Sequence, residues 1–256
     1  MTDRIRLGRG VLEVPKLGVY RHAGDLFDEL DRYAVLCREV SCISRRDGRL
    51  LGHAKDPITA GLAMENQLGP GRRLDGTAQV LCLGAGGAGT AITVRLLEAE
   101  PAPGRIVVAD KDPGRLATLR EICAGLGAGA VELARVRGAE DADALLAALP
   151  EGSLVINATG MGKDVPGSPL SGQARFPAGA LVWDLNYRGD LGFLSQAREQ
   201  AGARGLELHD GWRYFLHGWS QHIAQVYGLE LAPPAFERLA EAAEPLRQPT
   251  PATSQA

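Results

Sequence analysis

Short apolar runs alternate with helical patterns along the chain from Gln79 onward. The apolar runs have the length and composition of buried strands, and helical periodicity follows most of them. In order, the runs read QVLCL, RIVVAD, VELARV, SLVINAT, ALVWDL and LELHD. Strands that alternate with helices form right-handed crossovers and a parallel sheet covered on both faces. The sequence therefore predicts an α/β fold, with a doubly wound parallel-sheet Rossmann domain over residues 77–210.

The segments outside this region have a different pattern. It consists of a helix over 24–37, a hairpin over 39–54 that turns at Asp47-Gly48, and a helix over 57–69. We expect residues 1–76 to form a smaller α/β substrate-binding and catalytic domain, which the last helix, about residues 211–240, joins. The tail, residues 243–256, is rich in Pro, Ala, Ser and Thr and is predicted to be disordered.

The composition favours a soluble protein with a small-molecule partner. The 256 residues carry a net charge of -3, which gives no electrostatic reason to bind nucleic acid or an anionic membrane. No apolar run approaches the roughly 20 residues that span a bilayer, and the N-terminus has no secretory pattern, so we expect a cytoplasmic protein. The cysteines and histidines lack metal-ligand spacing, which predicts reduced, mostly buried thiols and no metal site.

A glycine cluster directly follows the first apolar run of the alternating region. Gly84, Gly86 and Gly89 form a G-x-G-x-x-G pattern between a predicted strand and a predicted helix, with Gly87 and Ala88 inside it. In this context the first glycine allows a tight turn, the second lets the backbone touch a diphosphate, and the third lets the helix pack closely on the sheet. We interpret the cluster as a dinucleotide-binding loop, against the alternative of a tight turn without a ligand.

The end of the next apolar run bears on the choice of dinucleotide. Asp110 lies there, and an acidic side chain at that place can accept hydrogen bonds from the ribose hydroxyls of NAD and repel the 2′-phosphate of NADP. Lys111 and Arg115 are close in sequence and could offset that repulsion. We predict NAD as the cofactor, with NADP as the alternative. Asp110 and Asp112 could instead only cap the following helix.

Taken in order, these motifs make the chain resemble the shikimate/quinate dehydrogenase family from about Gly10 to Gly228. GAGGAG corresponds to the family's glycine loop, and INATGMG resembles its N-A-T-x-x-G-M segment beside the nicotinamide. WDLNYRGDLGFLSQA resembles the family's D-x-x-Y-x-P-x-x-T-x-L-L-x-x-A stretch in outline. The resemblance adds four residues to the expected cofactor site: Asn157, Thr159, Met161 and Leu185.

The resemblance implies reversible hydride transfer between nicotinamide and a secondary alcohol on a small cyclic carboxylated or polyhydroxy compound. In the family a Lys and Asp pair moves the hydroxyl proton, and a partly desolvated lysine can reach the pKa that this step needs. Lys16 in GVLEVPK is the best match for that lysine, Lys55 is the second candidate, and Asp56 is the matching aspartate. The alternatives are lysines exposed on the surface and an Asp56 that only begins a helix.

The expected substrate pocket departs from the family pattern. Ser41 and Ala54 stand where the family has asparagines, and the N-terminal S-x-S-P segment has no counterpart, because the chain begins later than the family does. We therefore expect a shortened substrate domain and a substrate other than shikimate. Its expected contacts are Ser41, Tyr187 and Gln221. An edge left exposed by absent first strands would favour a homodimer.

Two alternative functions follow from these departures. One is an NAD-binding regulatory protein that has lost turnover. The other is a reductase that acts on an imine or ketone of a different small metabolite. The retained Asp56 and the Met161-Gly162 loop favour an active dehydrogenase.

Overall fold

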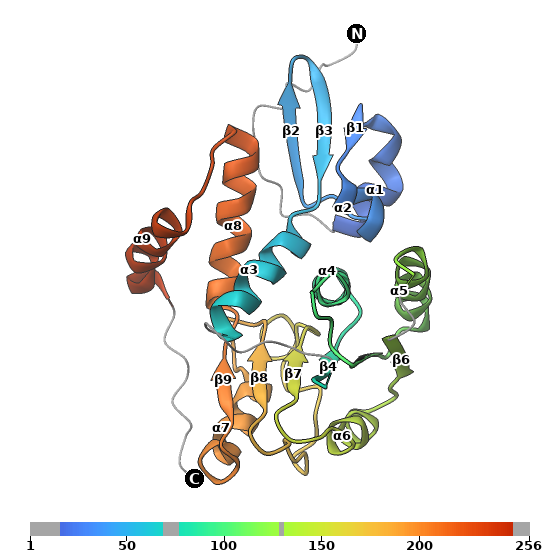
Figure 1. Cartoon of the computed structure of the whole chain (residues 1–256). Coiled ribbons are helices and arrows are strands. Elements are labelled where there is room, and N and C mark those ends of the chain that lie inside the picture. Colours follow the sequence, from blue (N-terminus) through green and yellow to red (C-terminus); the bar gives the residue numbers. More distant parts are fainter. Residues whose placement is uncertain (1–15, 69–76, 128–130, 248–256) are drawn as a thin grey trace.

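The computed structural model of the chain describes residues 16–68, 77–127 and 131–247. Figure 1 shows a three-stranded sheet with short helices at the top and a six-stranded sheet with its helices below. The long helix α8 (Trp212–Tyr227) runs beside both parts and packs against helix α3 (Asp56–Leu68) and against strand β2 (Cys42–Arg46). These contacts of α8 connect the small sheet to the part of the chain that contains the large sheet.

The large sheet has the strand order β6-β5-β4-β7-β8-β9, and all of its pairs are parallel. Its strands are β4 (Gln79–Leu83), β5 (Arg105–Asp110), β6 (Val131–Arg135), β7 (Leu154–Asn157), β8 (Leu181–Asp184) and β9 (Glu207–His209). The chain enters at the centre, runs outward to β6 and returns to β7 on the other side of β4. This reversal opens a crevice at the carboxyl ends of β4 and β7. The predicted doubly wound fold is confirmed.

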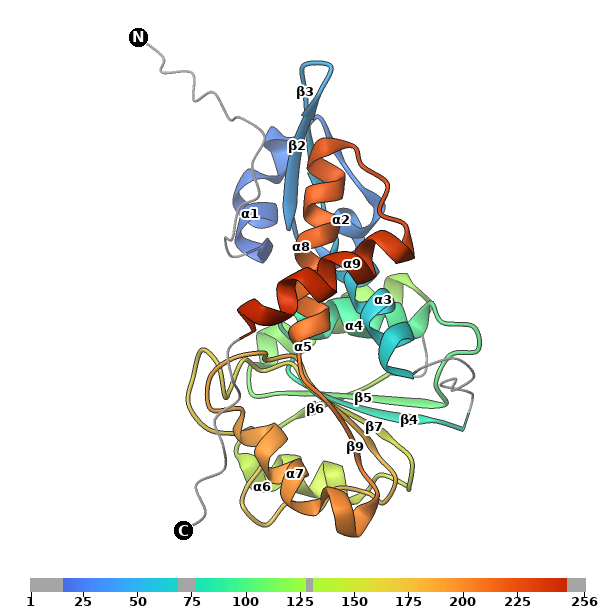
Figure 2. The ribbon, with the colours of Figure 1, turned by 90° about the vertical axis from the view of Figure 1, so that its left-hand side faces the viewer.

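Helices cover both faces of the large sheet, as Figure 2 shows. The helices of this part are α4 (Gly87–Leu97), α5 (Pro113–Gly125), α6 (Ala139–Ala147) and α7 (Gly192–Arg204). Successive side chains of a strand point to opposite faces. Val80 and Cys82 accordingly pack in the core under α3, α4 and α5, whereas Leu81 and Leu83 pack in the core under α6 and α7. Both faces of β4 are buried, which explains its continuous apolar sequence.

The small sheet has the order β1-β3-β2, with β1 (Glu29–Leu30) and β3 (Arg49–His53) parallel and β2 and β3 antiparallel. The predicted hairpin is present, and Asp47 and Gly48 take positive φ angles of 50° and 82° at its turn. The prediction of one helix over 24–37 is wrong. The segment divides into η1 (Gly24–Leu26), β1 and α2 (Arg32–Cys37), and helix α1 (Lys16–Ala23) precedes it.

Asp31 explains why that helix starts late. Its side chain accepts a hydrogen bond from the Ala34 backbone N–H at 2.8 Å and caps α2, so that the residues before it are free to pair with β3. The carboxyl ends of β1 and β3 point toward the large sheet, whose strands β7, β8 and β9 end toward them (Figure 1). The carboxyl edges of both sheets therefore face the same region.

The end of the described chain is ordered further than predicted. Helix α9 (Pro233–Ala243) is followed by the short helix η2 (Glu244–Leu246), and Phe236 and Ala240 pack with Trp212 of α8. Arg247 forms an ion pair with Asp210. The prediction of disorder from residue 243 is thus wrong for 243–247, since an apolar stripe and an ion pair hold these residues. Residues 248–256 lie outside the described residues.

All four cysteines are buried free thiols, as predicted. Burial raises the pKa of Cys42 to about 11 and that of Cys82 to about 12, so these thiols stay protonated at neutral pH. In the described parts of the chain, no helix combines the length and the apolarity of a bilayer span. The same parts contain no cluster of three or more His, Cys, Asp or Glu side chains that could hold a metal ion.

Candidate active site

The glycine loop connects β4 to α4 at the crevice of the large sheet. Gly84 has a φ of +110°, and a Cβ atom at this position would lie 2.7 Å from the backbone of Ala158. A Cβ atom at Gly89 would lie 1.9 Å from the Gly84 carbonyl oxygen, whereas one at Gly86 would meet nothing within 4 Å. Gly84 and Gly89 therefore serve close packing, and Gly86 leaves bare backbone open to a ligand. This arrangement fits a bound dinucleotide.

The N-terminus of α4 lies directly behind this open backbone. Gly86 is the N-cap residue and has no side chain to cap the helix, so the first amides of α4, from Gly87 and Ala88 onward, are suited to a diphosphate. The buried Glu39 was not identified from the sequence. Its Oε2 lies 3.0 Å from where a Cβ atom of Gly87 would be, which brings a carboxylate of the small-sheet part to the first turn of α4.

Asp110 fastens the glycine loop to the end of β5. Its Oδ2 accepts a hydrogen bond from Ala85 N at 2.7 Å, and its Oδ1 accepts one from Asp112 N at 2.8 Å. Each oxygen keeps a further lone pair with which it can accept a hydrogen bond from a ribose hydroxyl. Asp112, not Asp110, caps α5 through Gly114 N. The predicted capping role therefore applies to Asp112 alone.

A cavity of about 630 Å³ adjoins the glycine loop, and its lining includes the following residues: Tyr20, Arg21, Arg38, Ala85, Thr90 and Arg115. This volume is within the usual range for a small-molecule site. Arg115 Nη1 lies 3.7 Å from Asp110 Oδ2, and Arg38 pairs with Glu121 at 2.6 Å. Lys111 is exposed and does not line the cavity. The cavity thus presents guanidinium groups from α1, from the end of α2 and from α5.

The INATGM segment folds tightly around Asn157 at the end of β7. Asn157 Oδ1 accepts hydrogen bonds from the N–H and the hydroxyl of Thr159, at 3.1 and 2.7 Å. Asn157 Nδ2 donates to the Met161 carbonyl at 3.2 Å and to Asp184 Oδ1 at 3.1 Å. Leu185 N donates to the Asn157 carbonyl at 3.0 Å, so these predicted residues share one corner of the crevice.

A buried ionic cluster lies at the carboxyl ends of β1 and β3. Lys55 Nζ lies 3.5 Å from Asp31 Oδ2, and His53 Nδ1 lies 3.4 Å from the same oxygen. Burial by itself would raise the pKa of Asp31, but hydrogen bonds from His53 and from the amides of Ala34 and Ala54, with the Lys55 charge, lower it overall. Asp31 therefore carries a stable negative charge beside a lysine that is almost fully buried.

Polar side chains of α8 and β2 extend this cluster. Ser44 Oγ lies 2.9 Å and Gln225 Nε2 lies 3.3 Å from His53 Nε2, which fits a neutral ring with its proton on Nδ1. Ser41 Oγ accepts a hydrogen bond from Lys55 N at 2.8 Å and lies 3.3 Å from His222 Nε2. Of the α8 glutamines, Gln225 contacts the cluster, one helical turn beyond the predicted Gln221.

The structure also places the other predicted residues. Asp56 is buried at the start of α3, directly after Lys55 in the chain. Lys16 begins α1, and its side chain lies outside the described part of the chain. Tyr187 stacks on Phe215 with a centroid distance of 4.3 Å, within an aromatic cluster.

Charge also links Asp56 and Glu39 to Tyr214 of α8. Burial raises the pKa of the Tyr214 hydroxyl well above its usual value, and the charges of Asp56 and Glu39 raise it further. Asp31, Glu39 and Gln225 were not identified from the sequence as site residues, because no local motif contains them. His53, three residues before Asp56, is a candidate from the sequence for orienting the substrate.

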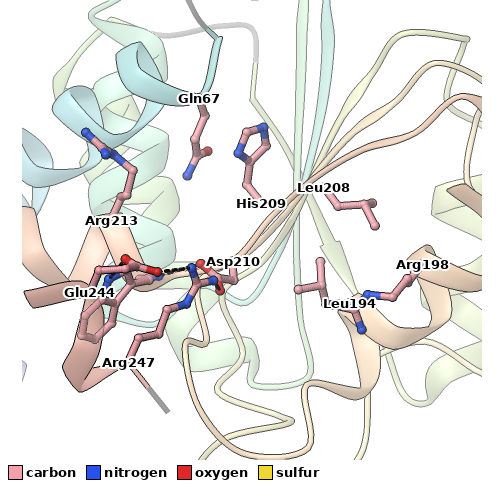
Figure 3. A pocket seen from close by; sticks show the side chains of 10 residues that line it. Gln67, Leu194, Arg198, Leu208, His209, Asp210, Arg213, Glu244 and Arg247 are labelled. Carbon is pink, nitrogen blue, oxygen red and sulfur yellow. Dashed lines mark hydrogen bonds and ion pairs between the residues drawn. The ribbon is translucent and has the colours of Figure 1, made fainter. Parts of the chain in front are cut away.

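A second cavity, of about 420 Å³, lies beyond the end of β9, and Figure 3 shows its lining, which includes Gln67, Arg198, His209, Asp210, Arg213 and Arg247. Arg247 pairs with Asp210 and with Glu244, and Arg213 pairs with Glu237. Most charges of this cavity are therefore paired within the protein. We assign no ligand to it.

The chain is similar in sequence to shikimate dehydrogenases, although no family model matches it. The shikimate dehydrogenase (NADP(+)) of Streptococcus gordonii is 31% identical over 192 residues, which cover 74% of this chain and 62% of that protein. That of Methylobacterium radiotolerans is 34% identical over 176 residues, which cover 67% of this chain and 55% of that protein. The chain thus spans less than two thirds of the length of these relatives.

Solved structures extend the likeness to the fold. The quinate dehydrogenase of Corynebacterium glutamicum in complex with NAD matches with a TM-score of 0.70 and 28% identity, over 90% of this chain and 74% of that one. The shikimate 5-dehydrogenase of Thermus thermophilus in complex with NADP(H) and shikimate matches with a TM-score of 0.66 and 26% identity, over 93% and 80%. In sequence and in fold, the chain is similar to shikimate and quinate dehydrogenases.

Proposed function

We propose that the chain is an NAD(P)-dependent dehydrogenase that transfers hydride between nicotinamide and a secondary alcohol or ketone of a small cyclic carboxylated or polyhydroxy substrate. The observation that carries the proposal is the open backbone at Gly86, which lies at the N-terminus of α4 and next to a cavity of a size suited to a nucleotide. The relatedness to shikimate and quinate dehydrogenases supports the same reaction class.

Different residues of the crevice would bind different parts of the coenzyme. When bound, the coenzyme supplies the hydride acceptor or donor. The glycine loop and the first amides of α4 would hold its diphosphate, and Asp110 would accept hydrogen bonds from the adenine-side ribose. Asn157, Thr159, Met161 and Leu185 shape the nicotinamide side.

Alcohol oxidation also releases a proton, which a basic side chain must accept. Lys55 is the candidate that the described geometry supports, because it is buried beside Asp31 and hydrogen-bonded neighbours hold it in place. Lys16 stays an alternative on the resemblance alone. Asp56 is the expected acidic partner at the start of α3.

The substrate contacts proposed from the sequence are Ser41, Tyr187 and Gln221. Ser41 lies within the polar cluster, while Tyr187 stacks in an aromatic group, which favours a contact through its ring edge or hydroxyl. His53 and Gln225 add polar groups at the same place. The relatives are named for shikimate and quinate, both ring compounds with a carboxylate and hydroxyl groups, and this supports the proposed substrate class.

The coenzyme choice has arguments on both sides. Asp110 supports NAD, which is bound in the quinate dehydrogenase structure. The arginines of the adjoining cavity support NADP, which is named for the curated relatives. We retain NAD as the first expectation and NADP as the alternative.

Absorbance measurements on the purified protein test the proposal. The reduced-nicotinamide band should appear with NAD or NADP and a panel of cyclic hydroxy acids and polyols. Saturable coenzyme binding without turnover across the panel would instead support the regulatory alternative. Size-exclusion chromatography tests the predicted homodimer.

A further inference from the structure

Asp184 ends β8 at the carboxyl edge of the large sheet, next to the predicted nicotinamide loop. Its Oδ1 accepts hydrogen bonds from Asn157 Nδ2 at 3.1 Å and from Asn186 N at 3.0 Å. The side-chain amides of the same two asparagines donate to the Met161 carbonyl, at 3.2 Å from Asn157 and 2.7 Å from Asn186. One carboxyl group thus ties the ends of β7 and β8 to the loop that follows β7.

The other oxygen of this carboxyl group is buried and unsatisfied. Asp184 has 0% exposure, and among the described residues its Oδ2 has no hydrogen-bond partner. A buried ionised oxygen without a donor is costly, and protonation removes that cost. Burial accordingly raises the pKa of Asp184 to about 7, so both protonation states are accessible at neutral pH.

Few charged groups act on Asp184. Asp210, which follows β9, raises the pKa of Asp184 by repulsion, and Arg247 offsets part of the Asp210 charge (Figure 3). The group that faces Asp184 from β7 is an uncharged amide. In the loop after β7, Lys163 pairs with Asp164 at 3.0 Å. A cation bound at the carboxyl ends of β7 and β8 would therefore shift the protonation equilibrium of Asp184 strongly toward the carboxylate.

We propose that Asp184 is a positioning residue of the nicotinamide half-site and releases a proton when an oxidised, cationic nicotinamide ring binds there. The inference rests on the proposed function. A positive ring stabilises the carboxylate, whereas the reduced ring is neutral and does not. Asp184 therefore strengthens binding of the oxidised coenzyme as the pH rises through neutrality, and it fixes the Met161 carbonyl through Asn157 and Asn186.

Calorimetric titration in buffers of different ionisation enthalpy counts the protons exchanged on binding. At pH 7 the wild-type protein should release about half a proton with the oxidised coenzyme and close to none with the reduced coenzyme. Asp184→Asn keeps the shape and the Oδ1 acceptor but cannot ionise. We expect it to bind both forms, to release no proton, and to lose the pH dependence of the ratio between the two dissociation constants.

Asp141→Asn serves as the matched control, because Asp141 is exposed on α6. It should behave as the wild type does. Equal proton release by the wild type and Asp184→Asn would overturn the inference and leave coenzyme binding standing. If no nicotinamide coenzyme binds the wild-type protein, the proposed function fails and the inference fails with it.

Aspartate labelled with ¹³C at its carboxyl carbon gives a second measurement in the unsubstituted protein. One carboxyl resonance should titrate near pH 7 without coenzyme and move to lower pH when the oxidised coenzyme is bound. The inference is overturned if every aspartate resonance titrates below about pH 5 in the coenzyme-free protein.

Discussion

Lys55 Nζ lies 3.5 Å from Asp31 Oδ2, and this contact joins the carboxyl ends of β3 and β1. The two residues are 24 positions apart in the chain. Asp31 also caps α2 and receives the Ala54 amide at 3.2 Å, so its position is fixed from three sides. A lysine held in this way is buried and oriented, as our proposal requires of the group that exchanges a proton with the substrate hydroxyl.

Replacement of Lys55 tests this role directly. Lys55→Met should lower kcat by ~10²- to 10⁴-fold, the usual contribution of a general acid or base. Asp31→Asn keeps the helix cap but removes the charge, and should lower kcat less. Lys111→Met is the control, since Lys111 is exposed, and steady-state absorbance assays give the comparison. If Lys55→Met keeps the wild-type kcat and Lys16→Met loses most of it, the proton is accepted by Lys16 and not by Lys55.

Gly86 and Gly89 should respond differently to substitution. Gly86→Val places a side chain in open space, so it should raise the coenzyme Kd by about tenfold or more, ~1.4 kcal/mol, with little change in Tm. Gly89→Ala forces a Cβ atom against the Gly84 carbonyl and should destabilise the fold by about 1–3 kcal/mol or more. Calorimetry and thermal unfolding measure the two effects. Wild-type coenzyme affinity in Gly86→Val would contradict binding on this open backbone.

Arg115 is expected to influence the choice between the two coenzymes. It lines the nucleotide cavity and lies 3.7 Å from both Asp110 and Asp112, so it can reach a 2′-phosphate at the expense of these weak ion pairs. Arg115→Gln should raise the Kd for NADP by about tenfold and change that for NAD by less than about twofold. Arg120→Gln, on the exposed side of α5, is the control. Equal losses for both coenzymes would rule out this role.

Asp184 should make the protein less stable as the pH rises. Its pKa is raised from 3.8 to about 7 in the folded state, so the folded protein binds an extra proton between these values. Protonated Asp184 contributes its full share to the free energy of unfolding below about pH 4, and this contribution is lost as the pH rises through about 7. The whole contribution is on the order of 4 kcal/mol. Denaturant unfolding at acidic and mildly alkaline pH should show a decline that Asp184→Asn reduces. An unchanged decline in that variant would contradict the buried-carboxyl account.

The large sheet could be predicted from the sequence because each of its strands corresponds to a short apolar run that is recognisable locally. Both faces of β4 are buried, so its apolar run is continuous, and the glycine loop follows it at fixed spacing. The two-residue strand β1 could not be found in this way. It depends on pairing with β3 and on the Asp31 cap, which interrupts an otherwise helical pattern.

The candidate site was predictable only where it follows a motif. Gly86 and Asn157 belong to recognisable local patterns, and both lie where such patterns place them. The contact between Gln225 and His53 joins residues 172 positions apart, and no local pattern encodes it. Buried charges such as Glu39 and Asp184 likewise acquire their properties from the surrounding fold.

The proposed function requires that a nicotinamide dinucleotide binds on the open backbone at Gly86. Calorimetric titration of the wild-type protein with NAD and NADP, each oxidised and reduced, measures this binding. We predict saturable binding of at least one coenzyme, which Gly86→Val weakens. Absence of saturable heat with all four would contradict the proposed function.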